Sequence, residues 1–171
     1  GNRTKRIDNL GRTTEYEYDA LNRLSKIKYL LSAENLVTAL STTYNYDELS
    51  RLTSAINEAG TVSLTYDNRS RLKTETDIFG HVIEYGYDAN SNRVLLKLDG
   101  ASDATYTYDD SNRLKTIINV DDNTTTTYDY DFANRLTSRL LPNGITTTYN
   151  YDGMSRLTRL KDATAAATIF D

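Results

Sequence analysis

One nine-residue pattern recurs along the chain and constrains its fold more than any other feature. Tyr149–Leu157 reads Tyr-Asn-Tyr-Asp-Gly-Met-Ser-Arg-Leu, and Tyr16–Leu24 and Tyr44–Leu52 repeat it with few changes. Seven copies are present, with their aspartates at Asp19, Asp47, Asp67, Asp88, Asp109, Asp131 and Asp152. After a longer first interval the spacing is 20 to 22 residues. A fixed period of this length indicates a repeat architecture, in which each unit packs on its neighbours.

The residues before each aspartate alternate in character. Thr147, Tyr149 and Tyr151 alternate with polar residues, which predicts a β-strand with its tyrosines on one face. We expect these rings to be buried between neighbouring hairpins. The alternative, an exposed aromatic row that stacks on sugars, stays open.

The residues after each copy alternate as well, for example Leu136, Ser138 and Leu140, and predict a second strand. No segment has the apolar spacing of a helix. The sequence therefore predicts an all-β fold, a repeat array of antiparallel β-hairpins forming an open, curved and twisted strip. Residues 1–171 read as a single array, which we expect to be truncated at both ends.

A four-residue link that starts at the aspartate joins the two strands. Its last position holds a small polar residue in every copy: Asn22, Ser50, Ser70, Asn92, Asn112, Asn134 and Ser155. Such residues suit a type I turn followed by a left-handed residue. The copy at Asp88 has one extra residue before Arg93, which predicts a loop one residue wider.

Two further features complete the array. Glycines mark a second set of turns between copies, at Gly11, Gly60, Gly80, Gly100 and Gly144. Residues 30–41 interrupt the period, and we predict a longer inter-strand insert there.

The motif side chains are the candidate functional residues. They are Tyr16, Tyr18, Asp19, Arg23, Tyr44, Tyr46, Asp47, Arg51, Tyr66, Asp67, Arg71, Tyr85, Tyr87, Asp88, Arg93, Tyr106, Tyr108, Asp109, Arg113, Tyr128, Tyr130, Asp131, Arg135, Tyr149, Tyr151, Asp152 and Arg156. We interpret each aspartate as the cap of its own turn, and each arginine as the partner of a carboxylate or a tyrosine ring. The alternative is that the aspartate and the arginine act as an acid and an electrophile in an enzyme. Seven identical copies of the pair disfavour that alternative.

Composition excludes several classes of function. A net charge of −4 with mixed signs disfavours nucleic-acid binding, which needs a basic stripe. No run of 18 apolar residues could span a bilayer, and residues 1–30 lack the apolar stretch of a signal peptide, so any export signal is expected outside this sequence. The absence of cysteine excludes disulfides and thiolate metal sites.

Other candidate residues do not assemble into a site. His81 is the only histidine, which favours a surface role over catalysis. The acidic pairs Asp109-Asp110 and Asp121-Asp122 lack the ligand spacing of a calcium loop. Three tripeptides match N-glycosylation acceptors, as expected by composition, at Asn2, Asn68 and Asn123. We therefore predict no catalytic, cofactor-binding or metal residues and no cofactor.

The recurring Tyr-Asp-x-x-x-Arg-Leu pattern closely resembles the RHS or YD repeat family over essentially the whole chain. The resemblance implies a strip of hairpins that winds into a hollow shell in full-length members. Such shells enclose a toxic domain in bacterial polymorphic and insecticidal toxins, and related arrays support cell adhesion in teneurins. The chain departs from bacterial members in showing neither a self-cleaving segment nor a toxin domain.

The first functional hypothesis is thus a non-enzymatic wall segment that encapsulates a cargo polypeptide, in a secreted or cell-surface protein. Its partners would be the rest of its own repeat array and the enclosed cargo, with no nucleic acid and no membrane span. The alternative is an extracellular adhesin module that binds carbohydrate or protein. Unpaired edge strands would also favour edge-to-edge or end-to-end self-association.

Overall fold

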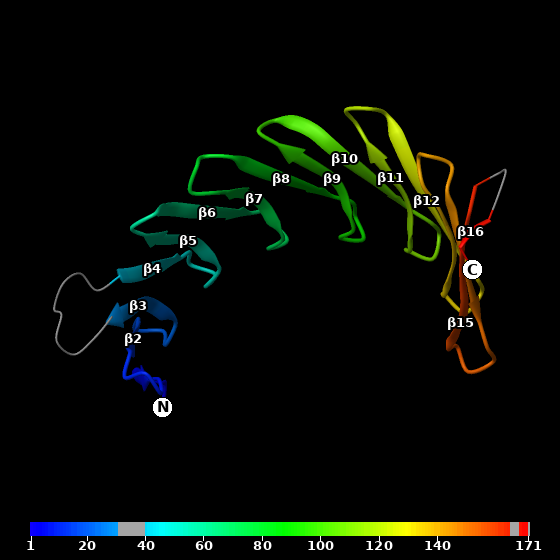
Figure 1. Ribbon diagram of the computed structural model, residues 1–171. Coiled ribbons are helices and arrows are strands. Elements are labelled where there is room, and N and C mark those ends of the chain that lie inside the picture. Colours follow the sequence, from blue (N-terminus) through cyan, green and yellow to red (C-terminus); the bar gives the residue numbers. More distant parts are fainter. Residues whose placement is uncertain (31–39, 165–167, 171) are drawn as a thin grey trace. The chain divides into compact units, whose positions relative to one another are not determined.

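The structure, a computed structural model, describes residues 1–30, 40–164 and 168–170. These residues form strands and turns and contain no helix (Figure 1). The strands are β1 (Lys5–Ile7), β2 (Thr13–Tyr18), β3 (Leu24–Leu30), β4 (Leu40–Tyr46), β5 (Leu52–Asn57), β6 (Gly60–Tyr66), β7 (Leu72–Thr76), β8 (Val82–Tyr87), β9 (Arg93–Leu98), β10 (Ala101–Tyr108), β11 (Leu114–Asn119), β12 (Thr124–Tyr130), β13 (Leu136–Leu140), β14 (Thr146–Tyr151), β15 (Leu157–Ala163) and β16 (Thr168–Phe170).

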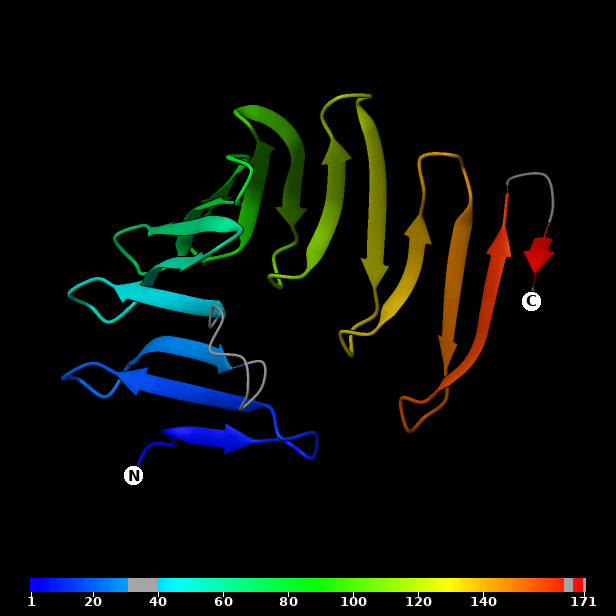
Figure 2. The same cartoon turned by 60° about the vertical axis from the view of Figure 1, so that its left-hand side comes forward.

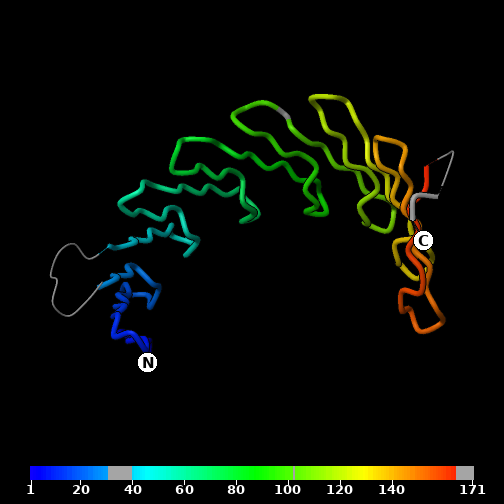
Figure 3. The backbone as a smooth tube through the Cα atoms, viewed as in Figure 1, coloured from blue at the N-terminus to red at the C-terminus, as the bar shows by residue number. Residues whose placement is uncertain are grey.

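The strand order follows the chain order throughout. The chain divides into two compact units, Gly1–Ile83 and Glu84–Asp171, and each is a run of antiparallel hairpins. In the second unit, Figure 2 shows strands lying side by side with alternating direction, and the trace in Figure 3 passes from one hairpin straight into the next. The predicted all-β array of antiparallel hairpins is confirmed.

Each motif hairpin with a described register contains a β-bulge just before its turn. In the β4–β5 hairpin, Asn45 pairs with Ser54 but the next residue, Tyr46, pairs with Leu52, so Thr53 is an extra residue. The same shift occurs in the hairpins that end at Tyr18, Tyr66, Tyr108, Tyr130 and Tyr151. A bulge leaves one residue outside the regular ladder and bends the strand locally.

The residue just before the last tyrosine of a copy points to the face opposite that tyrosine, because side chains alternate along a strand. This face carries short polar cross-strand pairs. The Asn45 amide donates to Ser54 Oγ at 2.8 Å, the Ser138 hydroxyl donates to Asp129 at 2.8 Å, and the hydroxyls of Thr65 and Thr74 lie 2.5 Å apart. One face of each unit is therefore polar, and the other carries the tyrosines.

No apolar core is enclosed by the described residues. Among the residues whose burial is described, only Thr147 is buried, at 2% exposure, and no hydrophobic side chain is fully buried. The motif tyrosines are half-buried, which is less than the burial expected from sequence. Each unit is thus a single layer of sheet, whose stability comes from contacts between neighbouring strands.

The interruption of the period falls mostly outside the described residues. Leu30 ends β3 and Leu40 begins β4, with Leu40 paired to Tyr29, so the two strands form a hairpin. Residues 31–39, which hold most of the predicted insert, are not described. Among the described residues no helix is long and apolar enough to cross a bilayer.

Replacing Gly86 in β8 tests how tightly the strands pack. A Cβ at Gly86 would lie 2.9 Å from Leu95 Cβ, whereas a Cβ at Gly153 would meet nothing within 4 Å. Gly86→Ala is expected to destabilise the chain by about 1–3 kcal/mol, as overpacking does. Gly153→Ala, the matched control, should change the free energy of unfolding by less than about 0.5 kcal/mol. Urea unfolding measures both, and equal effects would contradict the close packing at Gly86.

Candidate functional site

The turn of each motif copy is organised by its aspartate. In the copy at Asp47, the N–H of Asp47 donates to the Arg51 carbonyl and the N–H of Ser50 donates to the Asp47 carbonyl, both at 3.0 Å. The Asp47 carboxylate caps the turn from inside, because its Oδ1 accepts the N–H groups of Leu49 and Arg51 at 2.9 Å. One carboxylate oxygen thus satisfies two donors that the turn leaves unpaired.

The last turn position has a left-handed backbone, as predicted. Ser50 has φ of 62°, and the same conformation recurs at Asn22, Ser70, Asn112, Asn134 and Ser155. Non-glycine residues adopt this region at a cost, and Asn tolerates it better than most residues. The predicted type I turn followed by a left-handed residue is therefore confirmed in these six copies.

The copy at Asp88 corrects one prediction. The expected wider loop was wrong, because Asp88 N–H donates to the Asn92 carbonyl and Ser91 N–H donates to the Asp88 carbonyl, as in every other copy. Ser91, with φ of 71°, is the left-handed residue. Asn92 holds the position of the motif arginine, with its amide 2.9 Å from Asp88 Oδ2, and Arg93 moves into the first strand position. The extra residue is absorbed by the strand because the carboxylate fixes the length of the turn.

The motif arginine closes the turn from outside. Arg51 Nε donates to Asp47 Oδ2 at 2.7 Å, and its Nη2 lies 2.7 Å from the same oxygen. Charge-assisted hydrogen bonds of this kind are shorter and stronger than neutral ones. The same aspartate–arginine pairing is present at Arg23, Arg71, Arg113, Arg135 and Arg156.

The same guanidinium also holds the next repeat. Arg51 Nη1 donates to the Asp67 carbonyl at 3.4 Å and to Ser70 Oγ at 3.1 Å. Its Cζ lies 4.6 Å from the centre of the Tyr66 ring, within cation–π range. Tyr66 completes the link, because its hydroxyl donates to the Leu52 carbonyl at 2.8 Å. We call this set of contacts between successive turns the clamp.

The clamp recurs in other copies of the motif. Arg23, Arg113 and Arg135 each donate to the carbonyl of the next motif aspartate and to the left-handed side chain beyond it, which is Ser50, Asn134 or Ser155. Their Cζ atoms lie 4.6 to 4.9 Å from the rings of Tyr46, Tyr130 and Tyr151. Arg156 holds Asp152, but its side chain is 74% exposed against 24% for Arg51.

Two turns between motif copies use the same carboxylate geometry, which sequence reasoning missed. Asp8 Oδ1 accepts the N–H groups of Leu10 and Arg12, and Arg12 Nε donates to Asp8 Oδ2 at 2.6 Å. Asp77 Oδ1 accepts the N–H groups of Phe79 and His81 in the same way. The signal is present in the sequence, since both turns read Asp-x-x-Gly. Aspartate and glycine together mark such a capped turn, and glycine alone is an incomplete marker.

The remaining motif tyrosines lie in the strands. In the two-tyrosine copies whose register is described, the first tyrosine pairs across its hairpin, as Tyr16 does with Ile27 and Tyr44 with Ala55. Tyr106 has an additional contact with the displaced Arg93, whose Cζ lies 4.7 Å from the centre of the Tyr106 ring. The hydroxyls of Tyr18, Tyr46, Tyr108, Tyr130 and Tyr151 donate to carbonyls of the preceding repeat. Tyr85, Tyr87 and Tyr149 complete the row within β8 and β14.

Hydrogen bonds and burial shift the pKa values in opposite directions. The pKa of Asp47 is lowered from its ordinary 3.8, first by the Arg51 backbone N–H and then by the Arg51 guanidinium. The pKa values of Asp19, Asp67, Asp109, Asp131 and Asp152 are lowered as well. Burial raises the pKa of Tyr44 and Tyr130. These aspartates are thus held ionised, and Tyr44 and Tyr130 are held neutral, which suits structural contacts.

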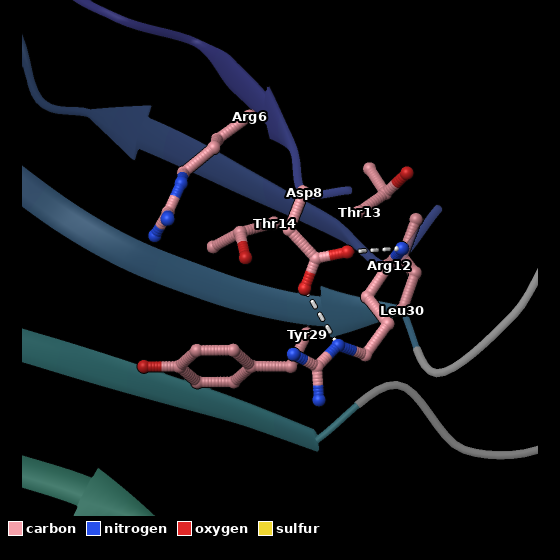
Figure 4. A pocket seen from close by; sticks show the side chains of 7 residues that line it. All are labelled: Arg6, Asp8, Arg12, Thr13, Thr14, Tyr29 and Leu30. Carbon is pink, nitrogen blue, oxygen red and sulfur yellow. Dashed lines mark hydrogen bonds and ion pairs between the residues drawn. The ribbon is translucent and has the colours of Figure 1, made fainter. Parts of the chain in front are cut away.

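No grouping of these side chains in the described part of the chain resembles a catalytic or metal centre. Three or more His, Cys, Asp or Glu side chains do not converge anywhere among those residues. His81 is exposed just before β8, and Asp122 accepts the backbone N–H of Thr124 within its own turn. A hollow of about 280 Å³ lies beside the Asp8–Arg12 pair (Figure 4). Its lining residues are Arg6, Asp8, Arg12, Thr13, Thr14, Tyr29 and Leu30.

The fold and the clamp define a class of protein, the tandem β-hairpin repeat array. The RHS Repeat family model matches residues 1–31 and 130–167, which agrees with the resemblance that the motif indicates. No curated protein sequence matches the chain.

Solved structures with the same fold come from Tc toxin components. The crystal structure of TcdB2-TccC3-Cdc42 aligns with a TM-score of 0.75 at 19% identity, covering 91% of this chain and 9% of that one. The Tc holotoxin pore of Photorhabdus luminescens aligns with a TM-score of 0.57 at 16% identity, covering 94% of this chain and 11% of that one. The chain therefore spans about a tenth of the length of these neighbours, and the likeness concerns its fold.

Removing one tyrosine hydroxyl tests the link between repeats. Tyr130 donates to the Leu114 carbonyl at 2.9 Å, so Tyr130→Phe should destabilise the chain by about 0.5–1.5 kcal/mol. The matched control is Tyr128→Phe in the same strand, whose hydroxyl makes no carbonyl bond among the described residues. Thermal unfolding compares the two variants, and a larger loss for Tyr128→Phe would contradict this role.

The lowered aspartate pKa values predict acid sensitivity. A carboxylate whose folded pKa lies below its unfolded value stabilises the fold fully above the unfolded pKa, about 3.9, and loses that effect as pH falls through the folded pKa. For Asp47 the folded pKa lies below 3.8. Stability should therefore stay level from neutral pH to about pH 5 and fall below about pH 4. Urea midpoints measured at several pH values test this, and an unchanged midpoint at about pH 3 would contradict it.

Proposed function

We propose that the chain is a non-enzymatic wall segment of a shell that encloses a cargo polypeptide in a longer parent protein. The observation that carries the proposal is the single-layer hairpin array held together from turn to turn by the clamp. Such an array grows by adding repeats without closing around a core, which is what an extended wall requires. Its fold is shared with chains of TcdB2-TccC3 and of a Tc holotoxin pore.

The proposal fits the burial pattern. Motif tyrosines are half-buried on one face, and none of the described apolar side chains is covered by a second layer. A sheet normally buries one face against another layer. An uncovered face can therefore contact an enclosed cargo or a neighbouring part of the wall. We propose that the cargo, a polypeptide toxin, is the principal partner besides the rest of the repeat array.

The length of the array limits what it can enclose alone. The described residues form sixteen strands, and at the usual spacing of about 4.8 Å that number of strands amounts to roughly 75 Å of sheet. A cargo of about 100 residues has a radius of gyration near 13 Å and needs a wall on the order of 140 Å around. The chain therefore supplies part of a wall. A secreted or cell-surface parent is the location that this role requires.

A second candidate is a protein-binding adhesin module, and one observation favours it. Large apolar residues project from motif turns, with Leu21, Leu49, Phe132 and Met154 at 67% exposure or more. Turn positions normally favour small polar residues, so exposed apolar tips are a feature of interaction surfaces. The carbohydrate-binding alternative has less support, because the motif tyrosines are held in contacts with neighbouring repeats.

Limited proteolysis of the intact parent separates the two candidates. Digestion with mass spectrometry should leave a domain beyond the array protected while the array is intact. The double variant Arg113→Ala and Arg135→Ala opens two clamps and should speed cleavage of that domain, with the exposed Lys115→Ala as a surface control. Cleavage of the domain at the rate of the isolated domain in the wild-type parent would overturn the wall proposal. Capture of a partner by the apolar turns would then make the adhesin the leading account.

A further inference from the structure

Two kinds of residue occupy the clamp position of the repeats. Most copies have arginine there, but the copy at Asp88 has Asn92, whose amide nitrogen donates to Asp88 Oδ2 at 2.9 Å. The start of the chain shows the same substitution. Tyr18 donates to the Arg3 carbonyl at 3.0 Å, just as Tyr66 donates to the Leu52 carbonyl, so Asn2 stands where Arg51 stands. Asn2-Arg3 and Asn92-Arg93 are therefore equivalent pairs.

The asparagine clamps contact asparagine in the next turn. Asn92 Nδ2 donates to Asn112 Oδ1 at 2.5 Å, and Asn112 Nδ2 donates back to Asn92 Oδ1 at 3.0 Å. Asn90 adds a third amide, donating to the same Asn112 oxygen at 3.2 Å. Asn2 Nδ2 likewise donates to Asn22 Oδ1 at 3.3 Å. Both asparagine clamps thus face a left-handed asparagine.

The arginine clamps contact a wider set of left-handed residues in the next turn. Their left-handed partners are Ser50, Ser70 and Ser155, and once Asn134, which accepts from Arg113 Nη1 at 2.9 Å. Arginine also binds the next aspartate carbonyl and stacks on the next tyrosine. An arginine clamp therefore depends only in part on the left-handed side chain, and serine suffices there.

We propose that the left-handed turn residue is a specificity residue that is matched to the clamp residue of the preceding repeat. An asparagine clamp requires asparagine at the next left-handed position, whereas an arginine clamp works with serine or asparagine. This inference concerns how the array orders its own repeats, and it does not depend on the proposed function.

The length of the clamp side chain explains this requirement for asparagine. The Asn92 side chain is short and already holds Asp88, so it contacts the next turn only if that turn extends an amide toward it. An amide offers both a donor and an acceptor, which permits the reciprocal pair. The serine hydroxyl oxygen lies one bond nearer to the backbone than the polar atoms of asparagine, so serine in place of Asn112 would not form the hydrogen bonds with Asn92. Glycine suits a left-handed position best but offers no side-chain acceptor.

The consequence is discrimination among nearly identical repeats. Hairpins that resemble one another can pair out of order, which is a characteristic failure of repeat proteins. An asparagine clamp that met a serine turn would lose its hydrogen bonds, so the Asn92 and Asn112 pair favours the correct neighbour. Specificity of this kind is a difference between matched and mismatched contacts.

Two matched substitutions in the full chain test the inference. Asn112→Ser and Asn134→Ser make the same change at the same turn position, with φ of 63° and 62°, and differ in the clamp residue they face. Asn112→Ser should lower the thermal unfolding midpoint by roughly 2 to 4 °C and raise hydrogen exchange in its turn. Asn134→Ser, which faces Arg113, should shift the midpoint by less than half as much. Equal losses in the two variants would overturn the inference.

A rescue experiment converts an arginine clamp into an asparagine clamp. Arg135→Asn should lower the unfolding midpoint, because Arg135 holds Asp152 and Ser155 in the next turn. Adding Ser155→Asn should recover part of that loss, although Ser155→Asn alone should be neutral. Arg135→Asn combined with Ser155→Ala is the control and should show no recovery. Recovery by alanine, or none by asparagine, would overturn the inference, and this series decides the matter if Asn112→Ser fails to fold.

Discussion

The rest of the structure depends on one carboxylate contact, the aspartate that caps its own turn. Asp47 Oδ1 accepts two backbone N–H groups, and Oδ2 is left to hold Arg51. Because the carboxylate determines where the turn ends, it also determines where the arginine emerges. The copy at Asp88 demonstrates this, since an extra residue in the sequence moved into the strand and left the turn unchanged.

Starting from that contact, each repeat is held in place by hydrogen bonds to the repeat before it. The arginine held by one aspartate reaches the carbonyl, left-handed side chain and tyrosine ring of the next copy. The tyrosine hydroxyl returns a hydrogen bond to the preceding repeat. Each contact is modest alone, since a hydrogen bond contributes about 1 kcal/mol net, but most repeats add the same set. A single layer can therefore be ordered without an enclosed apolar core.

Much of this architecture could be predicted from sequence because it is local. Alternation around Tyr149 and Tyr151 predicted strands, and the Asn or Ser before each arginine predicted a left-handed turn. The predicted loop length was wrong in the copy at Asp88, because the extra residue before Arg93 could belong either to the turn or to the strand. The account of the turns at Asp8 and Asp77 was also incomplete, because it marked them by glycine alone. Asp, Gly and the residue after them form one capped turn, and that unit is a better signal than glycine alone.

The sequence by itself determined the hairpins, their order and the turns that close them, because these follow from alternation, period and residues within a few positions of one another. Only the tertiary structure decided which groups meet between repeats: Arg51 with Ser70, Tyr66 with the Leu52 carbonyl, and Asn92 with Asn112. Those partners are 14 to 20 residues apart. Their pairing depends on how successive hairpins lie against one another, which side-chain type alone does not specify.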